Sequence, residues 1–163
     1  MKPLTIRGNY AFFWRQWPSN WKFSPFIIDG QQYTCVEQWM MAEKARLFND
    51  KLTLEKILLS PAPSEHQKLG RQVQNYDDAK WAAVRYSVVF AGTLEKYKQN
   101  PELWKRLHDT KNLTLVEASP ADLIWGIGFN ADDPDADNPD KWRGQNLLGK
   151  AITEARSIIR IEI

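Results

Sequence analysis

The 163-residue chain has one cysteine, two histidines and no long apolar run. A lone cysteine, Cys35, cannot form an internal disulfide, so we expect a reducing, cytoplasmic location. No segment approaches the ~20 apolar residues that cross a bilayer, and the N-terminus lacks an apolar signal segment, so no membrane partner is expected. The net charge of +2 excludes a tail-driven binder of nucleic acid but leaves open a nucleic acid gripped at one nucleotide.

Residues for metal chemistry are also scarce. His66 and His108 fall in predicted surface helices without cysteine or carboxylate at ligand spacing, and zinc needs three or four convergent ligands. The acidic segment 132–140 is similar to an EF-hand loop, but Asn138 stands where that loop needs glycine and Gly144 where it needs glutamate. We therefore expect no metal and no cofactor, and we interpret the acidic segment as a solvated loop.

The sequence contains none of the common nucleophile or phosphate-loop motifs. There is no G-x-S-x-G or P-loop, and Gly126-Ile127-Gly128 lacks the third glycine of a dinucleotide fingerprint. Cys35 stands at a predicted strand-to-helix junction, where a helix dipole lowers a thiol pKa. Without a histidine partner in the sequence pattern, we predict that Cys35 is a small buried residue.

Hydrophobic periodicity predicts an α+β fold, a single helix-rich domain over residues 1–163 with a small β-sheet. An Asp29-Gly30 turn predicts a hairpin. Thr34 with Glu37, and Ser64 with Gln67, have the spacing of helix capping boxes. Strands are expected at 10–14, 26–28, 31–34, 113–117 and 159–163, and helices at 36–48, 52–59, 64–70, 78–97, 101–108 and 147–158.

Glu37 and Lys44 are seven residues apart on one predicted helix, so they share a face two turns apart. The rest of that helix is apolar, so this face is expected to be partly desolvated. Desolvation lowers an amine pKa and raises a carboxyl pKa, which suits a nucleophilic lysine and a general acid/base. The alternative is that Glu37 is only a helix cap and Lys44 only a solvated side chain.

Two further segments combine polar residues with glycine and tryptophan. After the strand that ends at Glu117, Asp122 and Trp125 precede Gly126 and Gly128, where glycine would let a backbone approach a ligand. Asn146 precedes a helix whose free N–H groups would hold a phosphate. A turn with a core tryptophan, and simple capping, explain the same residues without function.

Taken in order, these features resemble the NADAR (YbiA-like) family. The matching pieces include Ser19-Asn20-Trp21, Val36-Glu37-Gln38-Trp39 with Lys44, Leu69-Gly70-Arg71, Trp81 with Arg85, Asp122-x-x-Trp125-Gly126-Ile127-Gly128 and Asn146-Leu147-Leu148-Gly149. The match covers about residues 12 to 157. The chain departs from the family at Gln38-Trp39, where Glu37 is usually followed by histidine and then tyrosine or phenylalanine, and at Trp21, where phenylalanine is usual.

The resemblance implies an N-glycosidase that separates a base amino nitrogen from C1 of a phosphorylated ribose. One branch of the family acts on aminopyrimidine intermediates of riboflavin synthesis. The other removes ADP-ribose from guanine of DNA or RNA, often paired with an ADP-ribosyltransferase. A module that binds ADP-ribose or a nucleotide without cutting it is the non-enzymatic alternative.

The resemblance also implies roles for individual residues. Glu37 and Asp122 are the acid/base candidates, and either water attacks C1 directly or Lys44 displaces the base through a Schiff base. Trp81 or Trp125 would stack on the base. The remaining substrate-binding candidates are Arg71, Arg85 and the Asn146 helix end for phosphate, with Asn20, Gly126, Gly128 and Leu147 from the matching motifs.

Overall fold

A computed structural model describes residues 2–159 of the chain. Its residues form two compact units, and each is described separately. Met1–Lys22 with Pro101–Ile163 is called the sheet unit, and Phe23–Asn100 is called the helical unit. The prediction of one domain over the whole chain stays a prediction. The strand expected at 159–163 lies outside the described residues except for Ile159, which ends a helix.

The sheet unit is built on three strands in the order β1-β2-β5. β1 runs antiparallel to β2, and β2 runs parallel to β5, with Tyr10 opposite Thr114 and Phe13 opposite Glu117. The sequence predicted β2 and β5 but not β1, which has three residues, none of them fully buried. The elements are β1 (Thr5–Arg7), β2 (Tyr10–Phe13), α5 (Pro101–Asp109), β5 (Thr114–Glu117), the 3-10 turn η1 (Pro139–Lys141) and α6 (Leu147–Ile158).

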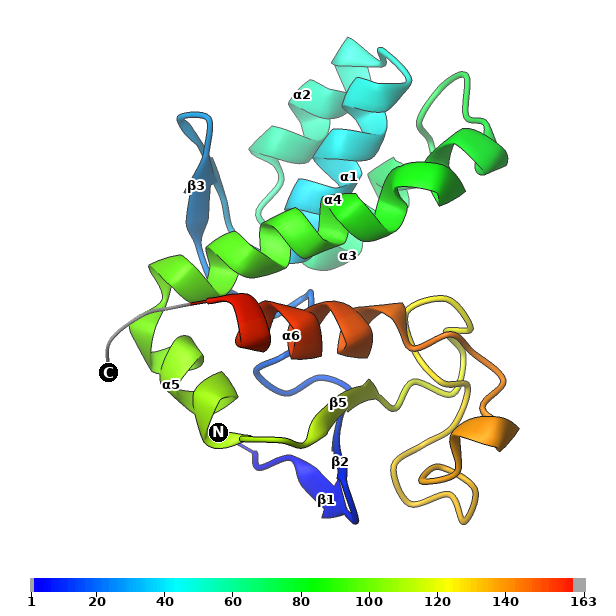
Figure 1. Cartoon of the computed structure of the whole chain (residues 1–163). Helices are drawn as coiled ribbons and strands as arrows, with labels where there is room; N and C mark the ends of the chain where they lie inside the picture. Colours follow the sequence, from blue (N-terminus) through cyan, green and yellow to red (C-terminus); the bar gives the residue numbers. More distant parts are fainter. Residues whose placement is uncertain (1, 160–163) are drawn as a thin grey trace. The chain divides into compact units, whose positions relative to one another are not determined.

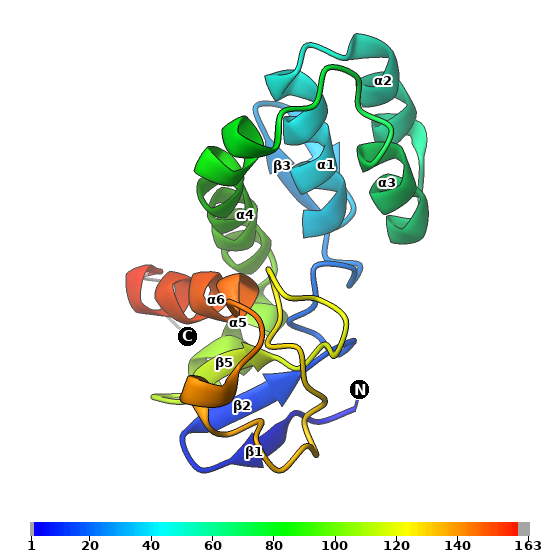
Figure 2. The ribbon, with the colours of Figure 1, turned by 90° about the vertical axis from the view of Figure 1, so that its right-hand side faces the viewer.

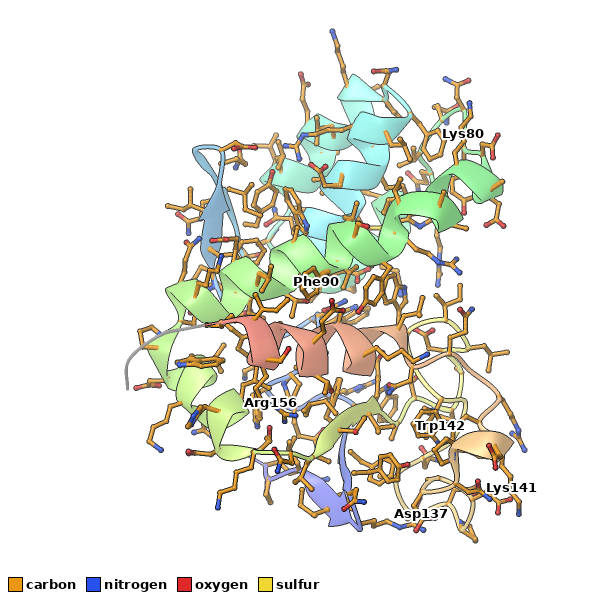
Figure 3. All side chains as sticks on the ribbon, viewed as in Figure 1. Lys80, Phe90, Asp137, Lys141, Trp142 and Arg156 are labelled. Atoms are coloured by element: carbon orange, nitrogen blue, oxygen red, sulfur yellow. The ribbon has the colours of Figure 1, made fainter. Side chains whose placement is uncertain are left out.

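Helix α6 lies along β5 (Figure 1). Its predicted inward residues Leu148, Ile152 and Ala155 are all buried. The Thr153 hydroxyl accepts a hydrogen bond from the Leu115 N–H at 3.0 Å, which ties the helix to the strand. Figure 3 shows Arg156 directed from α6 toward the turn before β5, where it donates to the Leu113 carbonyl at 2.8 Å.

The helical unit begins with the predicted hairpin, β3 (Phe26–Ile28) and β4 (Gln31–Tyr33). Both turn residues have positive φ, 49° at Asp29 and 78° at Gly30, as a two-residue hairpin turn requires. The Gln99 side chain bridges the hairpin to the end of the long helix, because it accepts from the Ile27 N–H and donates to the Ile27 carbonyl.

Four helices complete the helical unit. α1 packs against each of the other three, as the ribbon in Figure 2 shows. The Trp39 indole donates to the Val88 carbonyl at 2.7 Å, and a side chain at Gly92 would collide with that indole ring, so the two helices meet closely there. The helices are α1 (Val36–Leu47), α2 (Lys51–Leu59), α3 (Pro63–Gly70) and α4 (Asp78–Gln99).

The two predicted capping boxes are wrong, although helices α1 and α3, which they were predicted to begin, are present. Cys35 is the N-cap of α1 and makes no capping hydrogen bond, while the Thr34 N–H and hydroxyl donate instead to Gln38 Oε1. Ser64 is inside α3, because Pro63 with its fixed φ takes the first helical position. At α4, Asp77 is the N-cap residue, and its carboxylate accepts from the Lys80 N–H at 3.0 Å.

The α+β class is therefore confirmed: the described residues form six α-helices, one three-stranded sheet and one two-stranded sheet. Among residues 2–159, no helix combines the length and apolar character needed to cross a membrane.

Candidate active site

The predicted site residues divide between the two units. Lys44 and its predicted partners Glu37, Arg71, Trp81 and Arg85 lie in the helical unit. The sheet unit contains Asn20, Asp122, Trp125, Gly126, Gly128, Asn146 and Leu147.

Glu37 lies one residue inside α1 and is only 4% exposed. The N-cap of α1 is Cys35, whose side chain makes no capping hydrogen bond, so the predicted pairing of Thr34 with Glu37 as a capping box does not form. The neighbouring Gln38, which stands where the family usually has histidine, has a structural role. Its amide nitrogen donates to the Ile57 carbonyl at 3.0 Å while its oxygen accepts from Thr34, so Gln38 joins the start of α1 to the end of α2.

Lys44 is partly buried two turns further along α1. Burial lowers its pKa below the ordinary value of 10.5, the charge of Glu37 opposes that shift, and the charge of Arg71 adds to it. The ammonium nitrogen lies 4.4 Å from the ring centroid of Tyr76. The lysine therefore has a larger neutral, nucleophilic fraction at neutral pH than a solvated lysine has.

Two arginines carry positive charge into the same neighbourhood. Arg71 ends α3 and is exposed, and its charge acts on Lys44. Arg85 is partly buried on α4, and its charge acts on the Tyr76 hydroxyl. Tyr76, which the sequence reasoning missed because it lies in a loop without a motif, donates to Asp78 at 2.8 Å. Trp81 is buried at 7% exposure and packs as a core residue of this unit.

Two sequence expectations are wrong: His66 does not lie on a helix surface, and Cys35 does not lack a histidine neighbour. His66 was placed on a helix surface, but it is fully buried, with Nε2 2.6 Å from the Ser60 carbonyl. Its Nδ1 lies 3.8 Å from Cys35 Sγ, so the cysteine does have a histidine neighbour. Burial nevertheless raises the pKa of the Cys35 thiol and lowers that of His66, so both stay neutral. The prediction that Cys35 is a small buried residue is confirmed.

In the sheet unit, Asp122 organises the loop after β5. Its Oδ1 accepts from the Ile124 N–H at 2.9 Å and from the Trp125 N–H at 2.8 Å. Trp125 is partly buried beside it. Gly126 follows, and a Cβ there would lie 3.0 Å from the carbonyl oxygens of Glu117 and Asp122. Glycine at this position thus serves the packing of the loop itself.

The start of α6 is held by the same loop. The N–H groups of Leu147 and Leu148 donate to the carbonyls of Ile124 and Trp125, both at 3.2 Å. Two of the N–H groups that the sequence led us to expect free for a phosphate, those of Leu147 and Leu148, are therefore engaged within the protein. Asn146 makes no capping hydrogen bond either, although it is the N-cap residue.

Asn146 instead joins α6 to β5. It is 1% exposed, its Oδ1 accepts from the Glu117 N–H at 3.0 Å, and its Nδ2 donates to the Leu115 carbonyl at 3.1 Å. Asn20, also buried, lies in a turn in which the Ser19 hydroxyl accepts from the Trp21 N–H.

The acidic loop pairs with cations of the protein. Arg7 donates to the carbonyls of Ala131 and Asp133 and lies 3.1 Å from the Asp137 carboxylate. Lys141 lies 2.6 Å from Asp135. Within the described part of the chain, no three histidine, cysteine or acidic side chains gather as a metal site would need.

Comparison with known proteins agrees with this architecture. The model of the NADAR domain matches residues 12–160. The chain therefore belongs to the NADAR domain family.

Individual relatives span nearly the same length. "N-glycosidase R617" of Acanthamoeba polyphaga mimivirus is 41% identical over 142 residues, which is 86% of this chain and 84% of that protein. "Protein irg-1" of Caenorhabditis elegans is 33% identical, over 86% of this chain and 71% of its own. The NMR structure of the E. coli protein YbiA shares the fold, with a TM-score of 0.75 at 24% identity over 94% of this chain and 86% of YbiA.

Proposed function

We propose that the protein is an N-glycosidase that hydrolyses the bond between a base amino nitrogen and C1 of a phosphorylated ribose, with ADP-ribose on guanine of nucleic acid as its substrate. Family membership and relatives named N-glycosidase support the general reaction. The observation that carries the proposal is the partly buried Lys44, whose pKa is lowered by burial, on the same helix as the buried Glu37. A binding module would have no need for a lysine whose pKa is lowered by burial, two helical turns from a buried acid.

A lysine suits this bond because the reacting carbon is attached to nitrogen. The nitrogen lone pair opens the C1–O4′ bond, O4′ takes a proton, and C1 becomes an imine carbon. Lys44 Nζ then adds to C1, a proton passes from Nζ to the base nitrogen, and the bond between C1 and the base breaks. Water adds to the resulting lysine imine and releases the sugar, which recloses, so the net reaction is hydrolysis.

Glu37 is the proton carrier of this scheme. The ring opening needs a proton delivered to O4′, and the later addition of water needs one removed. Asp122 is the second acid/base candidate, with one carboxylate oxygen engaged by the backbone. Arg71 and Arg85 would hold phosphate, because guanidinium groups pair with phosphate oxygens in two-point contacts.

The test compares two substrates and traps the intermediate. Purified protein is offered an oligonucleotide with ADP-ribosylated guanine and, separately, a ribosylated aminopyrimidine of the riboflavin type. We expect faster turnover of the oligonucleotide, and borohydride added during turnover should fix ADP-ribose on Lys44, located by peptide mass spectrometry. Faster turnover of the aminopyrimidine would assign the protein to the metabolic branch. An ADP-ribosyltransferase encoded beside this protein is the expected functional partner.

A further inference from the structure

The sheet unit contains a hollow that none of the roles above uses. Its volume is about 770 Å³, and residues of β1, β2, the segment Trp14–Trp17 and residues 130–132 line it. All of these residues belong to the sheet unit, so the hollow is formed within one compact body.

The hollow opens at the carboxyl end of a parallel strand pair. Phe13 is the last residue of β2, Ala118 directly follows β5, and the Ala118 N–H donates to the Phe13 carbonyl at 2.7 Å. Both residues line the hollow. Ligands of parallel sheets bind outside the carboxyl ends of the strands, where the chain departs and leaves a crevice.

Four aromatic residues are among those that line the hollow. Phe12, Phe13 and Trp17 are at most 4% exposed, whereas Trp14 is 43% exposed. The Arg15 guanidinium lies 4.5 Å from the Trp14 ring centroid, so the two groups form a stack. The Trp14 N–H donates to Gln16 Oε1 at 2.8 Å, and this bond holds the segment in place without a ligand.

The charged residues that line the hollow are mainly basic. Lys2, Arg15 and Lys22 carry positive charge there, against one acid, Asp132. The acids further along the same loop are balanced within the protein, because Asp137 pairs with Arg7 and Asp135 with Lys141. Figure 3 shows Asp137 and Lys141 on this loop. Exposed tryptophan next to basic side chains is the chemistry that binds single-stranded nucleic acid, through stacking and phosphate contacts.

We propose that this hollow binds a nucleotide, with its base on the Trp14–Arg15 stack and its phosphate among Lys2, Arg15 and Lys22. Free nucleotides and nucleotides of a strand share this chemistry, and we assign the hollow to the strand that carries the modified guanine. This assignment rests on the proposed function, and it makes a single-stranded nucleic acid the substrate of the enzyme.

The first experiment measures binding alone, by fluorescence anisotropy of a short, unmodified, labelled single-stranded DNA. Trp14→Ala should weaken binding about 5- to 150-fold, the loss expected for one stacked base. Trp14→Phe should restore part of the affinity, and Arg15→Ala should reduce the salt dependence by about 0.7 in log–log slope. Unchanged affinity in Trp14→Ala would overturn the proposal.

Two matched controls test the location. Trp21 is also 43% exposed but does not line the hollow, and Arg106 is an exposed arginine on α5. Trp21→Ala and Arg106→Ala should leave affinity within about twofold of the unchanged protein, inside the scatter of neutral surface substitutions. A loss in Trp21→Ala equal to that in Trp14→Ala would show indiscriminate stacking and reject the hollow. Competition with AMP distinguishes a site for free nucleotides from a site for a nucleic-acid strand. A strand site should bind AMP far more weakly than the oligonucleotide.

Turnover separates this inference from the proposed function. Trp14→Ala should raise KM for the ADP-ribosylated oligonucleotide and leave kcat unchanged. Lys44→Arg should abolish turnover yet keep DNA affinity. Trp14-dependent binding without any glycosidase activity would end the proposed function and keep the nucleotide site. Turnover with an unchanged KM in Trp14→Ala would keep the proposed function and reject the nucleotide site.

Discussion

In the helical unit, Glu37 and Lys44 lie on a helix that is mostly buried, and the lysine pKa falls because of that burial. In the sheet unit, Asp122 and Asn146 use side-chain oxygen or nitrogen atoms to hold backbone groups of the β5–α6 connection. Both pairs are polar residues in family motifs. Their surroundings differ, and on this difference we base the proposal that bond cleavage depends on the helical unit, while Asp122 and Asn146 shape the β5–α6 connection.

Of the substitutions that test this difference between the two units, Lys44→Arg should have the largest effect on turnover. Arginine keeps the positive charge but forms no imine, so we expect turnover to fall roughly 10⁴-fold or more, as when a covalent nucleophile is removed. Lys80, exposed at the start of α4 in Figure 3, is the matched control. Lys80→Arg should retain full activity in the same steady-state assay. Near-normal activity of Lys44→Arg would favour direct attack by water.

Glu37→Gln should have the next largest effect. The change keeps the shape of the side chain and removes its proton transfer, so kcat should fall about 10²–10⁴-fold while KM stays near its original value. The charge of Glu37 also raises the Lys44 pKa, so the pH at which lysine trapping is half-maximal, already below 10.5, should fall further in this variant. A fully active Glu37→Gln, or an inflection that moves upward, would remove Glu37 from the mechanism.

Local patterns in the sequence predicted most of this structure. The hairpin followed from Asp29-Gly30, and α6 followed from the spacing of Leu148, Ile152 and Ala155. Strand β1 was not predicted, because its three residues are exposed or partly exposed and are too few to show an alternation of apolar and polar side chains. The Thr34 cap failed because the Gln38 side-chain oxygen accepts from both Thr34 donors. The Gln38 amide nitrogen is held by the Ile57 carbonyl, 19 residues away, and helix spacing does not predict that contact.

The candidate site was less accessible to sequence reasoning. The face shared by Glu37 and Lys44 follows from helix geometry, but the ring of Tyr76 beside the lysine depends on how the loop between α3 and α4 returns. The contact of His66 with Cys35 joins residues 31 positions apart, and no local pattern reports it. Phosphate binding at α6 was inferred from the helix start alone, whereas two of its N–H groups, of Leu147 and Leu148, donate to the loop carbonyls of Ile124 and Trp125.

Asn146→Ala tests the structural role of the sheet-unit residues through the free energy of unfolding. The substitution removes the side-chain hydrogen bonds to the Glu117 N–H and the Leu115 carbonyl, and it puts alanine at φ 51°, so we expect a loss of about 1–3 kcal/mol in unfolding free energy. Asn138→Ala, which removes an exposed contact to the Asp140 N–H, should cost less than about 1 kcal/mol. Urea unfolding followed by tryptophan fluorescence measures both. Equal losses would contradict the structural role of Asn146.

Asp122→Asn should have the smallest effect and decides which unit supplies the second proton carrier. The amide oxygen of asparagine can still accept from the Ile124 and Trp125 N–H groups, so the loop should keep its shape. If loop shape is the main contribution of Asp122, turnover should fall less than about tenfold, well short of the 10²–10⁴-fold typical of a lost general acid or base. Asp122→Ala, which removes the acceptor, should lose more activity and some stability. A collapse of kcat in Asp122→Asn equal to that in Glu37→Gln would instead give both units a proton-transfer role, because only the ionisable group distinguishes aspartate from asparagine at this position.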